Sequence, residues 1–299
     1  MADNGLVTEA GGDPDAGYEA RETLELVELM NEADSAVPAA VGRVAPHIAA
    51  VVDAVAERLR SGGRLIYVGA GSSGMIAALD ASECEATFSV RPGVVVALVA
   101  GGPAGAALAQ AEAEDDGESG ARDVMAIQVG PGDAVVGVSA SGSTPYVLGA
   151  LESARTAGAF TACVVAAPHS ALGRLVEREI AVVVGPEFLA GSTRLKAGTA
   201  QKLVLNTIST VSMIRLGKTY GNLMVDVAAA NEKLAGRVRR IVATASGASG
   251  RQVDDALEAA EGDARVAIVS LLAGVDATTA RHRLDRSDRS IARALELAE

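Results

Sequence analysis

Two glycine- and hydroxyl-rich segments of the sequence have the residue types that bind a phosphate group. The first, RLIYVGAGSSGMIAALDASE at residues 64–83, contains the pattern G-x-G-x-x-G in Gly69, Gly71 and Gly74. Dinucleotide-binding loops share this pattern, but they also need an acidic residue about 20 positions later, at the end of the next strand. The next apolar run, VVVALVA, is followed by glycine and proline instead. The sequence therefore favours a loop that holds some other phosphate.

Hydroxyl groups next to expected helix starts support this interpretation. Ser72 and Ser73 can cap the helix after the first loop, and its free N–H groups and positive dipole end favour an anion. The second segment, SASGSTPYV, repeats this chemistry with Ser139, Ser141 and Thr144. Ordinary helix capping is the better explanation for either segment alone. Two such loops at strand ends of one sheet reverse that preference.

Five short apolar segments alternate with helix-length segments and predict the sheet that positions these loops. Their hydrophobicity is continuous rather than alternating, which is typical of strands buried on both faces of a parallel sheet. We therefore expect a doubly wound α/β domain, whose ligand lies beyond the C-terminal ends of its strands. The expected strands are 65–69, 94–100, 134–139, 160–167 and 180–185.

The other segments predict helices and a division of the chain into three regions. Residues 1–18 are expected to form an irregular arm, 19–242 an α/β domain with flanking helices, and 246–299 a small helical domain that begins after the breaker SGASG. Pro46 should kink or divide the second of the flanking helices. These are expected at 19–33, 37–60, 195–217 and 224–242.

Composition and charge exclude several classes of partner. The chain of 299 residues carries a formal net charge of −12, which argues against nucleic acid and against an anionic membrane surface. Aromatic residues make up 2% of it and Trp is absent, so stacking on bases is not expected. Cys84 and Cys163 form no disulfide framework, and neither a membrane-spanning run nor a signal peptide is seen. We expect a cytoplasmic protein.

Longer motifs resemble a known family. GAGSSG followed by SASGSTPYV is similar to the sugar isomerase (SIS) domain, a phosphosugar-binding α/β fold. GPEFLAGSTRLKAGTAQK at 185–202 closely resembles the signature shared by the N-acetylmuramic acid 6-phosphate etherases and the glucokinase regulatory proteins. LDASEC, AEAEDD and GNLMVDVAAANEKL add to the resemblance, which runs from about residue 22 to the end. The length and the small helical C-terminus agree with the etherases, since the regulatory proteins are longer and have two SIS domains.

The resemblance implies a lyase that removes D-lactate from C3 of N-acetylmuramic acid 6-phosphate and leaves N-acetylglucosamine 6-phosphate. The reaction needs carboxylates or histidines as acid and base, but no redox cofactor and no metal. The family's two functional glutamates fall on Glu83 and Glu114. Glu83 is assigned proton transfer at C2 and at the ether oxygen, and Glu114 a supporting acid–base role. Without the resemblance both would be interpreted as solvated carboxylates. This holds for Glu114 in particular, because it lies in an acidic run, which usually forms a solvated face.

The resemblance also implies the binding residues and the partner. Phosphate should be bound by Ser139, Ser141 and Thr144, while Gly71, Ser72 and Ser73 lie near the sugar. Lys196 and Arg194 supply positive charge near the signature, or else pair with acids such as Glu187. Asn222 and Asp226 are expected to have a structural role. SIS domains commonly form dimers, so a homodimer is expected. The three histidines have no metal-site spacing.

Three departures from the etherase pattern leave other functions open. Where typical etherases have arginine, this chain has Met75 and Ser143, and Glu85 and Ala86 replace a Pro-Pro pair. Arginine grips carboxylates and phosphates bidentately, so its loss could change recognition of the lactyl group. The alternatives are a lyase or isomerase for a different 6-phosphosugar, or a non-catalytic sugar-phosphate sensor.

Overall fold

The computed structural model describes residues 17–102, 112–226 and 232–297. Contacts between residues divide the chain into two compact units. The first comprises Met1–Ser82 and Gly93–Ser209, and the second comprises Glu83–Pro92 and Thr210–Glu299. The predicted irregular arm lies almost entirely outside the described residues. This division does not test the predicted start of a small helical domain at residue 246, which stays a prediction.

A five-stranded parallel sheet in the order β2-β1-β3-β4-β5 forms the centre of the first unit. Leu65 of β1 lies opposite Val95 of β2 and Ala134 of β3. The predicted α/β fold class is therefore confirmed, and all five strands lie in or near the expected segments. Their bounds are β1 Leu65–Gly69, β2 Val95–Val99, β3 Ala134–Val138, β4 Phe160–Val165 and β5 Arg178–Ala181.

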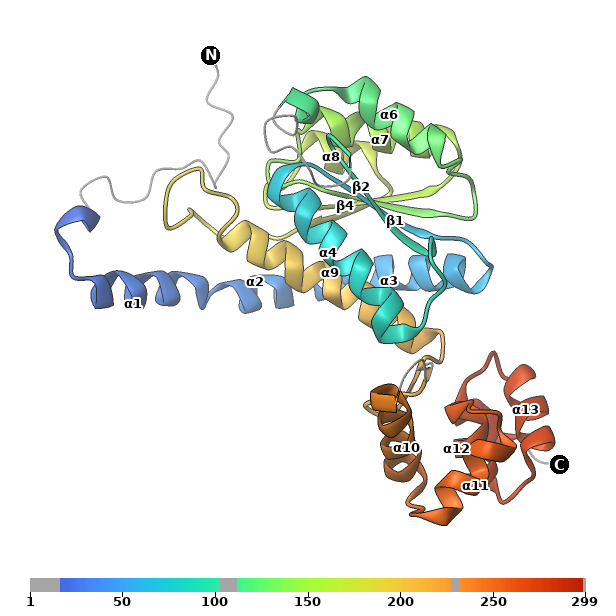
Figure 1. Cartoon of the computed structure of the whole chain (residues 1–299). Coiled ribbons are helices and arrows are strands. Elements are labelled where there is room, and N and C mark those ends of the chain that lie inside the picture. Colours follow the sequence, from blue (N-terminus) through green and yellow to red (C-terminus); the bar gives the residue numbers. More distant parts are fainter. Residues whose placement is uncertain (1–16, 103–111, 227–231, 298–299) are drawn as a thin grey trace. The chain divides into compact units, whose positions relative to one another are not determined.

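Helices cover both faces of this sheet (Figure 1), with α6, α7 and α8 on one face and α3, α4 and α9 on the other. Pro46 lies in the first turn of α3, and α2 meets α3 at a bend of 60°, so the predicted division of this segment is confirmed. The helical elements are η1 Tyr18–Ala20, α1 Thr23–Asp34, α2 Val37–Arg43, α3 Ala45–Arg60, α4 Gly71–Phe88, α6 Gly117–Ala126, α7 Pro145–Thr156, α8 Ala171–Leu175 and α9 Lys196–Arg215.

Within the described residues, no single helix is long and apolar enough to cross a membrane. The bent pair Thr23–Arg43 and Ala45–Arg60 meets the length and composition criteria only when its members are taken together.

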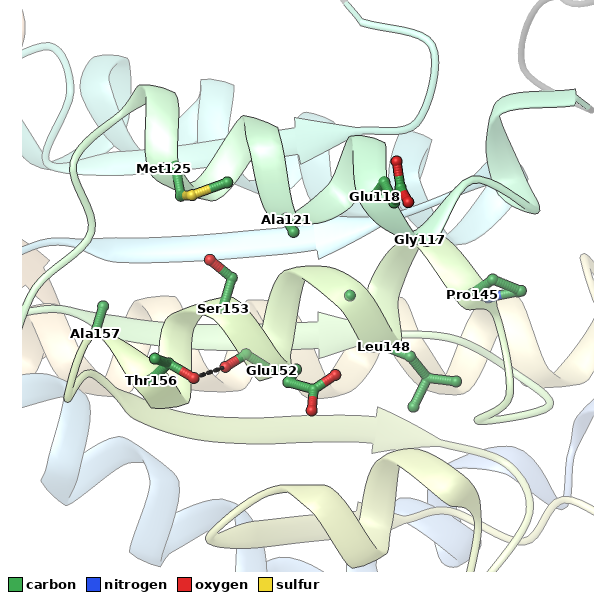
Figure 2. Close-up of a pocket in the computed structure, with 11 residues that line it drawn as sticks. Gly117, Glu118, Ala121, Met125, Pro145, Leu148, Glu152, Ser153, Thr156 and Ala157 are labelled. Carbon is green, nitrogen blue, oxygen red and sulfur yellow. Dashed lines mark hydrogen bonds between the residues drawn. The ribbon is translucent and has the colours of Figure 1, made fainter.

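Small residues let α6 and α7 pack side by side (Figure 2). A Cβ atom on Gly120 would lie only 2.0 Å from the carbonyl oxygen of Tyr146, so a larger residue there would force the helices apart. The groove that remains between them has a volume of about 720 Å³ and a largely apolar lining that includes Ala121, Met125 and Leu148. It shares no lining residue with the two phosphate loops, and its few polar groups do not converge, so we do not take it as the functional site.

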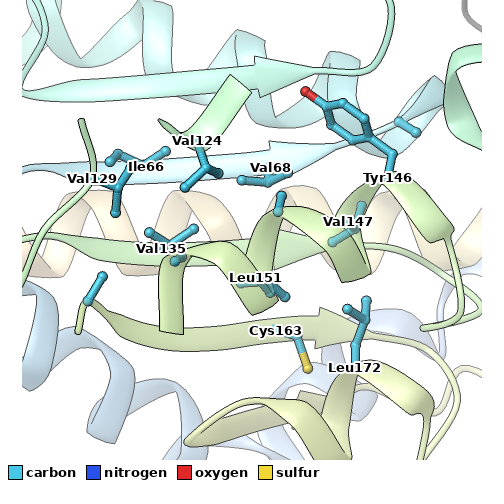
Figure 3. Close-up of a cluster of buried hydrophobic side chains, with 14 of the residues drawn as sticks. Ile66, Val68, Val124, Val129, Val135, Tyr146, Val147, Leu151, Cys163 and Leu172 are labelled. Atoms are coloured by element: carbon cyan, nitrogen blue, oxygen red, sulfur yellow. The ribbon is translucent and has the colours of Figure 1, made fainter. Parts of the chain in front are cut away.

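One hydrophobic core of the first unit lies between the sheet and helices α6 and α7 (Figure 3). Ile66, Val135 and Cys163 of three adjacent strands pack against Val147 and Leu151 of α7, and all five are buried. This packing holds the C-terminal ends of β1 and β3, which carry the two predicted phosphate loops, in one rigid layer.

An ion pair joins the N-terminal ends of β1 and β3. Arg64 donates through Nε and Nη2 to the carboxylate of buried Asp133, at 3.0 and 2.7 Å, and the N–H of Gly130 donates to the same group at 3.0 Å. Burial alone would raise the pKa of Asp133, but these hydrogen bonds hold it below its ordinary value of 3.8.

Replacing Asp133 with Asn should therefore lower the free energy of unfolding at neutral pH by about 1–3 kcal/mol. The unfolded chain binds more protons than the native chain between the lowered native pKa and the ordinary value of 3.8. The difference in the free energy of unfolding between the wild type and Asp133→Asn should thus be complete above that pH range and should be lost as the pH falls through it. Urea unfolding of both proteins as a function of pH measures this difference. A difference independent of pH would contradict the assignment.

The second unit contains a β-hairpin and a helical cluster. The hairpin, β6 Thr219–Tyr220 with β7 Leu223–Met224, turns at Gly221 and Asn222, so the expected helix at 224–242 is wrong at its start. A Gly-Asn pair between two short segments of strand-forming residues is itself a hairpin signal. The predicted helical character of the residues after 246 is confirmed by α11, α12, α13 and α14. The helices are α10 Glu232–Ser246, α11 Arg251–Ala259, α12 Ala264–Ala273, α13 Ala277–Asp285 and α14 Ile291–Glu296.

Asp226 ties this second unit together. Its carboxylate forms ion pairs with Lys218 and with Arg265, the latter at 3.0 Å. Asn222 is exposed in the hairpin turn. The structural role expected for Asp226 agrees with these contacts.

Candidate active site

The first loop passes directly from the last residue of β1 to the first turn of α4. A Cβ atom on Gly74 would lie 2.9 Å from the carbonyl oxygen of Gly69 and 2.8 Å from Cγ1 of Val99. The third glycine of the G-x-G-x-x-G pattern is thus required for close packing of α4 on the sheet. This packing leaves Ser72 and Ser73 in the first turn of a helix of 18 residues.

The second loop, residues 139–144, is held together by its own hydroxyl groups. Oγ of buried Ser139 lies 2.9 Å from Oγ1 of Thr144 and accepts a hydrogen bond from the N–H of Gly142 at 3.1 Å. Gly142 has a φ of +69°, and a Cβ there would lie 2.4 Å from Cβ of Ser170. The loop conformation therefore depends on glycine at this position.

Helix α7 starts directly after this loop, with Thr144 at the N-cap position. The Thr144 side chain makes no capping hydrogen bond, so it does not compete with an anion for the first N–H groups of the helix. The hydroxyl of Tyr146 donates to Asp123 at 2.6 Å and fixes α7 against α6. Burial, together with this carboxylate, raises the pKa of Tyr146 well above its usual range.

Both loops face one cavity of about 170 Å³ at the C-terminal ends of β1 and β3. Its lining combines backbone, hydroxyl groups and a single carboxylate, and none of these described residues carries a positive charge. An anion here would be stabilised by the N-termini of α4 and α7. The lining residues are Ala70, Gly71, Ser72, Ser73, Glu114, Val138, Ser139, Ala140, Ser141, Thr144 and Thr193.

Glu114 connects the two loops. Its Oε1 lies 3.5 Å from Oγ1 of Thr144, and a Cβ on Gly71 would lie 3.8 Å from its Oε2. Its neighbours in the acidic run have other roles: Asp116 caps α6 by accepting from the N–H of Ser119 at 2.8 Å. The run is thus not one solvated face, because Glu114 alone of its described acids lines the cavity.

The other predicted catalytic residue, Glu83, lies in α4 about three helical turns after Ser73. Its side chain is exposed, and it is not among the residues that line the cavity. Met75 and Ser143, which stand where typical etherases have arginine, are exposed as well and also lie outside this lining.

Lys196 is buried at the start of α9 and is likewise not part of the lining. Its Nζ donates to the carbonyl oxygen of Val184 at 3.1 Å. Glu187, considered above as a partner for the lysine charge, instead accepts from the backbone N–H groups of Lys196 and Ala197.

Thr193 lines the cavity, although it was not among the predicted site residues. The signal was present in GSTRLKAG, where a hydroxyl residue precedes the two charged residues that drew attention. Among the residues that the structure describes, no group of three or more His, Cys, Asp or Glu is arranged to hold a metal ion.

Comparison with known proteins agrees with this fold. Residues 47–155 match the family described as glucokinase regulatory protein N-terminal SIS domain. A phosphoheptose isomerase from Francisella tularensis superposes with a TM-score of 0.51 and 19% identity, over 65% of this chain and 100% of the other. At this identity the likeness shows a common fold.

Sequence relatives cover nearly the whole chain. The N-acetylmuramic acid 6-phosphate etherase of Rubrobacter xylanophilus is 56% identical over 93% of this chain and 93% of its own length. The protein of the same name from Streptomyces avermitilis is 52% identical over 98% of this chain and 94% of its own. The chain therefore belongs to the family of N-acetylmuramic acid 6-phosphate etherases.

Proposed function

We propose that this protein is an N-acetylmuramic acid 6-phosphate etherase, a carbon–oxygen lyase that releases D-lactate and leaves N-acetylglucosamine 6-phosphate. The observation that carries the proposal is the meeting of Glu114 with the hydroxyl groups of both loops in one cavity. The family to which the chain belongs supplies the reaction.

Recognition of phosphate is assigned to Ser139, Ser141 and Thr144 together with the N-terminus of α7. Gly71, Ser72 and Ser73 are assigned to the sugar. The uncapped N–H groups after Thr144 support the first assignment. Lys196 is proposed to stabilise the loop beside the site and not to contact the substrate, because its amine donates a hydrogen bond to the carbonyl oxygen of Val184.

The chemistry is an elimination followed by a hydration. Opening of the sugar ring exposes an aldehyde at C1, which acidifies the proton at C2. Glu83 removes this proton and protonates the ether oxygen as the C3–O bond breaks, so that D-lactate leaves and a C2–C3 double bond forms. Water then adds at C3 and a proton returns to C2, with Glu114 assisting ring opening or water addition.

A site that uses both glutamates requires that Glu83 be brought to the cavity. We assign this role to a second copy of the chain in a homodimer. Met75 and Leu79 are exposed on the same helix as Glu83, at 51% and 52%, and offer an apolar contact surface beside it. The cavity of about 170 Å³ is also smaller than the roughly 300–1,000 Å³ typical of ligand pockets, as expected for a site that another subunit completes.

A cytoplasmic location is proposed on the state of the cysteines. Cys84 and Cys163 are both buried, and Cys163 is a free thiol. Free cysteines are typical of proteins from reducing compartments.

Incubation with N-acetylmuramic acid 6-phosphate and measurement of free D-lactate tests the proposed reaction. We expect release that saturates with substrate, and none from N-acetylmuramic acid without the phosphate. Saturable binding of the phosphosugar with no release of lactate would contradict the proposal and favour the sensor or a different 6-phosphosugar.

A further inference from the structure

The loop between β5 and α9, residues 182–195, brings Thr193 to the wall of the cavity. Thr193 lies near the far end of this loop, well after the last residue of β5 and just before α9. Its position must therefore be fixed by contacts of its own.

Buried Glu187, which is 2% exposed, folds back from this loop onto the start of α9. Its Oε2 accepts from the N–H of Lys196 at 2.9 Å, and its Oε1 accepts from the N–H of Ala197 at 3.0 Å. Both oxygens of a buried carboxylate thus satisfy N–H groups of the first turn of a helix of 20 residues. In most helices the side chain of the N-cap residue, which directly precedes the first turn, accepts these hydrogen bonds.

Further contacts hold both arms of the loop. The Nζ of Lys196 donates to the carbonyl oxygen of Val184 at 3.1 Å, which closes the base of the loop. Phe188, next to Glu187, stacks on Tyr18 with ring centroids 4.6 Å apart. The carbonyl oxygen of Thr193 accepts from the N–H of Gly198 at 2.9 Å, so Thr193 is attached to the helix turn that Glu187 caps.

From these contacts we propose that Glu187 is a positioning residue of the active site, which fixes Thr193 at the cavity wall through the N-terminus of α9. Glu187 is not part of the cavity lining, so it acts through Thr193 and not on the ligand. The inference rests on the proposed function, because it takes the cavity to be the phosphosugar site.

Glu187→Gln tests the proposal with little change of volume. Glutamine offers one acceptor oxygen, and its NH₂ group would face the other backbone N–H. We expect binding of N-acetylglucosamine 6-phosphate, measured by calorimetry, to weaken about tenfold, the factor that loss of one hydrogen-bonding partner commonly costs. The KM should rise by a similar factor, while kcat should change less than about threefold.

Thr193→Val should have the same effect without touching the capping interaction. The double variant should bind no more weakly than the weaker single variant, because both changes remove one contact. Glu152→Gln, an exposed glutamate on α7, is the matched control and should bind as the wild type does.

Two results would overturn the proposal: wild-type affinity in Glu187→Gln, or multiplied losses in the double variant. Thermal unfolding monitored by circular dichroism identifies a variant that fails to fold; if Glu187→Gln fails, wild-type affinity in Thr193→Val would itself overturn the proposal. Calorimetry needs no turnover. A wild type that binds the phosphosugar but releases no lactate would therefore overturn the proposed reaction without affecting this test.

Discussion

Glu114→Gln is expected to lower the rate of D-lactate release by about 100- to 10,000-fold, the range that a positioned acid or base commonly contributes. Glutamine keeps the shape of the side chain and its contact with Thr144, but it can neither accept nor deliver the proton. Binding of N-acetylglucosamine 6-phosphate should change little. Glu83→Gln should lower the rate by a similar factor and also abolish exchange of the C2 proton in deuterated water.

Mixing the two variants separates a shared site from a site within one chain. If Glu83 acts in the cavity of the partner, a dimer with one chain of each variant has one site with both glutamates and one site with neither. Random reassortment should then restore about one quarter of the wild-type activity, since half of the dimers are mixed and half of their sites are intact. A mixture of Glu83→Gln with the double variant is the matched control and should stay inactive.

No recovery, with mixed dimers demonstrated by mass spectrometry, would show that Glu83 acts within its own chain or not at all. Full turnover by Glu83→Gln alone would remove it from the mechanism. Full turnover by Glu114→Gln would remove from the mechanism the one carboxylate that lines the cavity among the described residues, and it would contradict the proposed function more directly.

The parts of the site that the sequence predicted are those that depend on local chemistry at strand ends. Hydroxyl groups after β1 and after β3 must meet if the sheet is parallel and the two strands are neighbours. Ser72, Ser139 and Thr144 therefore line the cavity as expected. Glu114 was selected only through the family resemblance, because an acidic run by itself predicts a solvated face.

The features of the site that could not be predicted depend on the loop at residues 182–195, which folds back on the start of α9. Lys196 was expected either to supply positive charge near the signature or to pair with an acid, and its amine donates to the carbonyl oxygen of Val184. That contact exists because residues 182–195 fold back on α9, and Glu187 has both oxygens on backbone N–H groups. No periodicity or spacing in the sequence encodes such a contact. The same reversal brings Thr193 to the cavity.

Asp80→Ala should have the largest effect on stability among the residues near the site. Asp80 is buried in α4, at 6% exposure, and its carboxylate accepts from the hydroxyl of Tyr67 on β1 at 2.9 Å and from that of Ser209 on α9 at 3.1 Å. With its amide nitrogen toward Asp80, Asn206 adds a third donor at 3.1 Å. The carboxylate thus joins the strand to the two helices that pack on it.

Removing this carboxylate leaves buried donors without their acceptor and opens a void, so we expect the free energy of unfolding to fall by about 3–5 kcal/mol. Tyr67→Phe removes one donor only and should cost about 1 kcal/mol. In the double variant the two costs should not add, because both changes break the same hydrogen bond. Urea unfolding followed by circular dichroism measures all three.

A cost below about 0.5 kcal/mol for Asp80→Ala, the level of an ordinary surface substitution, would contradict this account. Ser82→Ala is the matched control, since Ser82 lies on the exposed face of the same helix and donates only to the carbonyl oxygen of Leu79 in its own turn. The expected contrast between positions two residues apart follows from the helix period: Asp80 faces the sheet and α9, and Ser82 faces solvent. The position of Ser72 and Ser73 at the cavity thus depends on a buried carboxylate two turns further along α4.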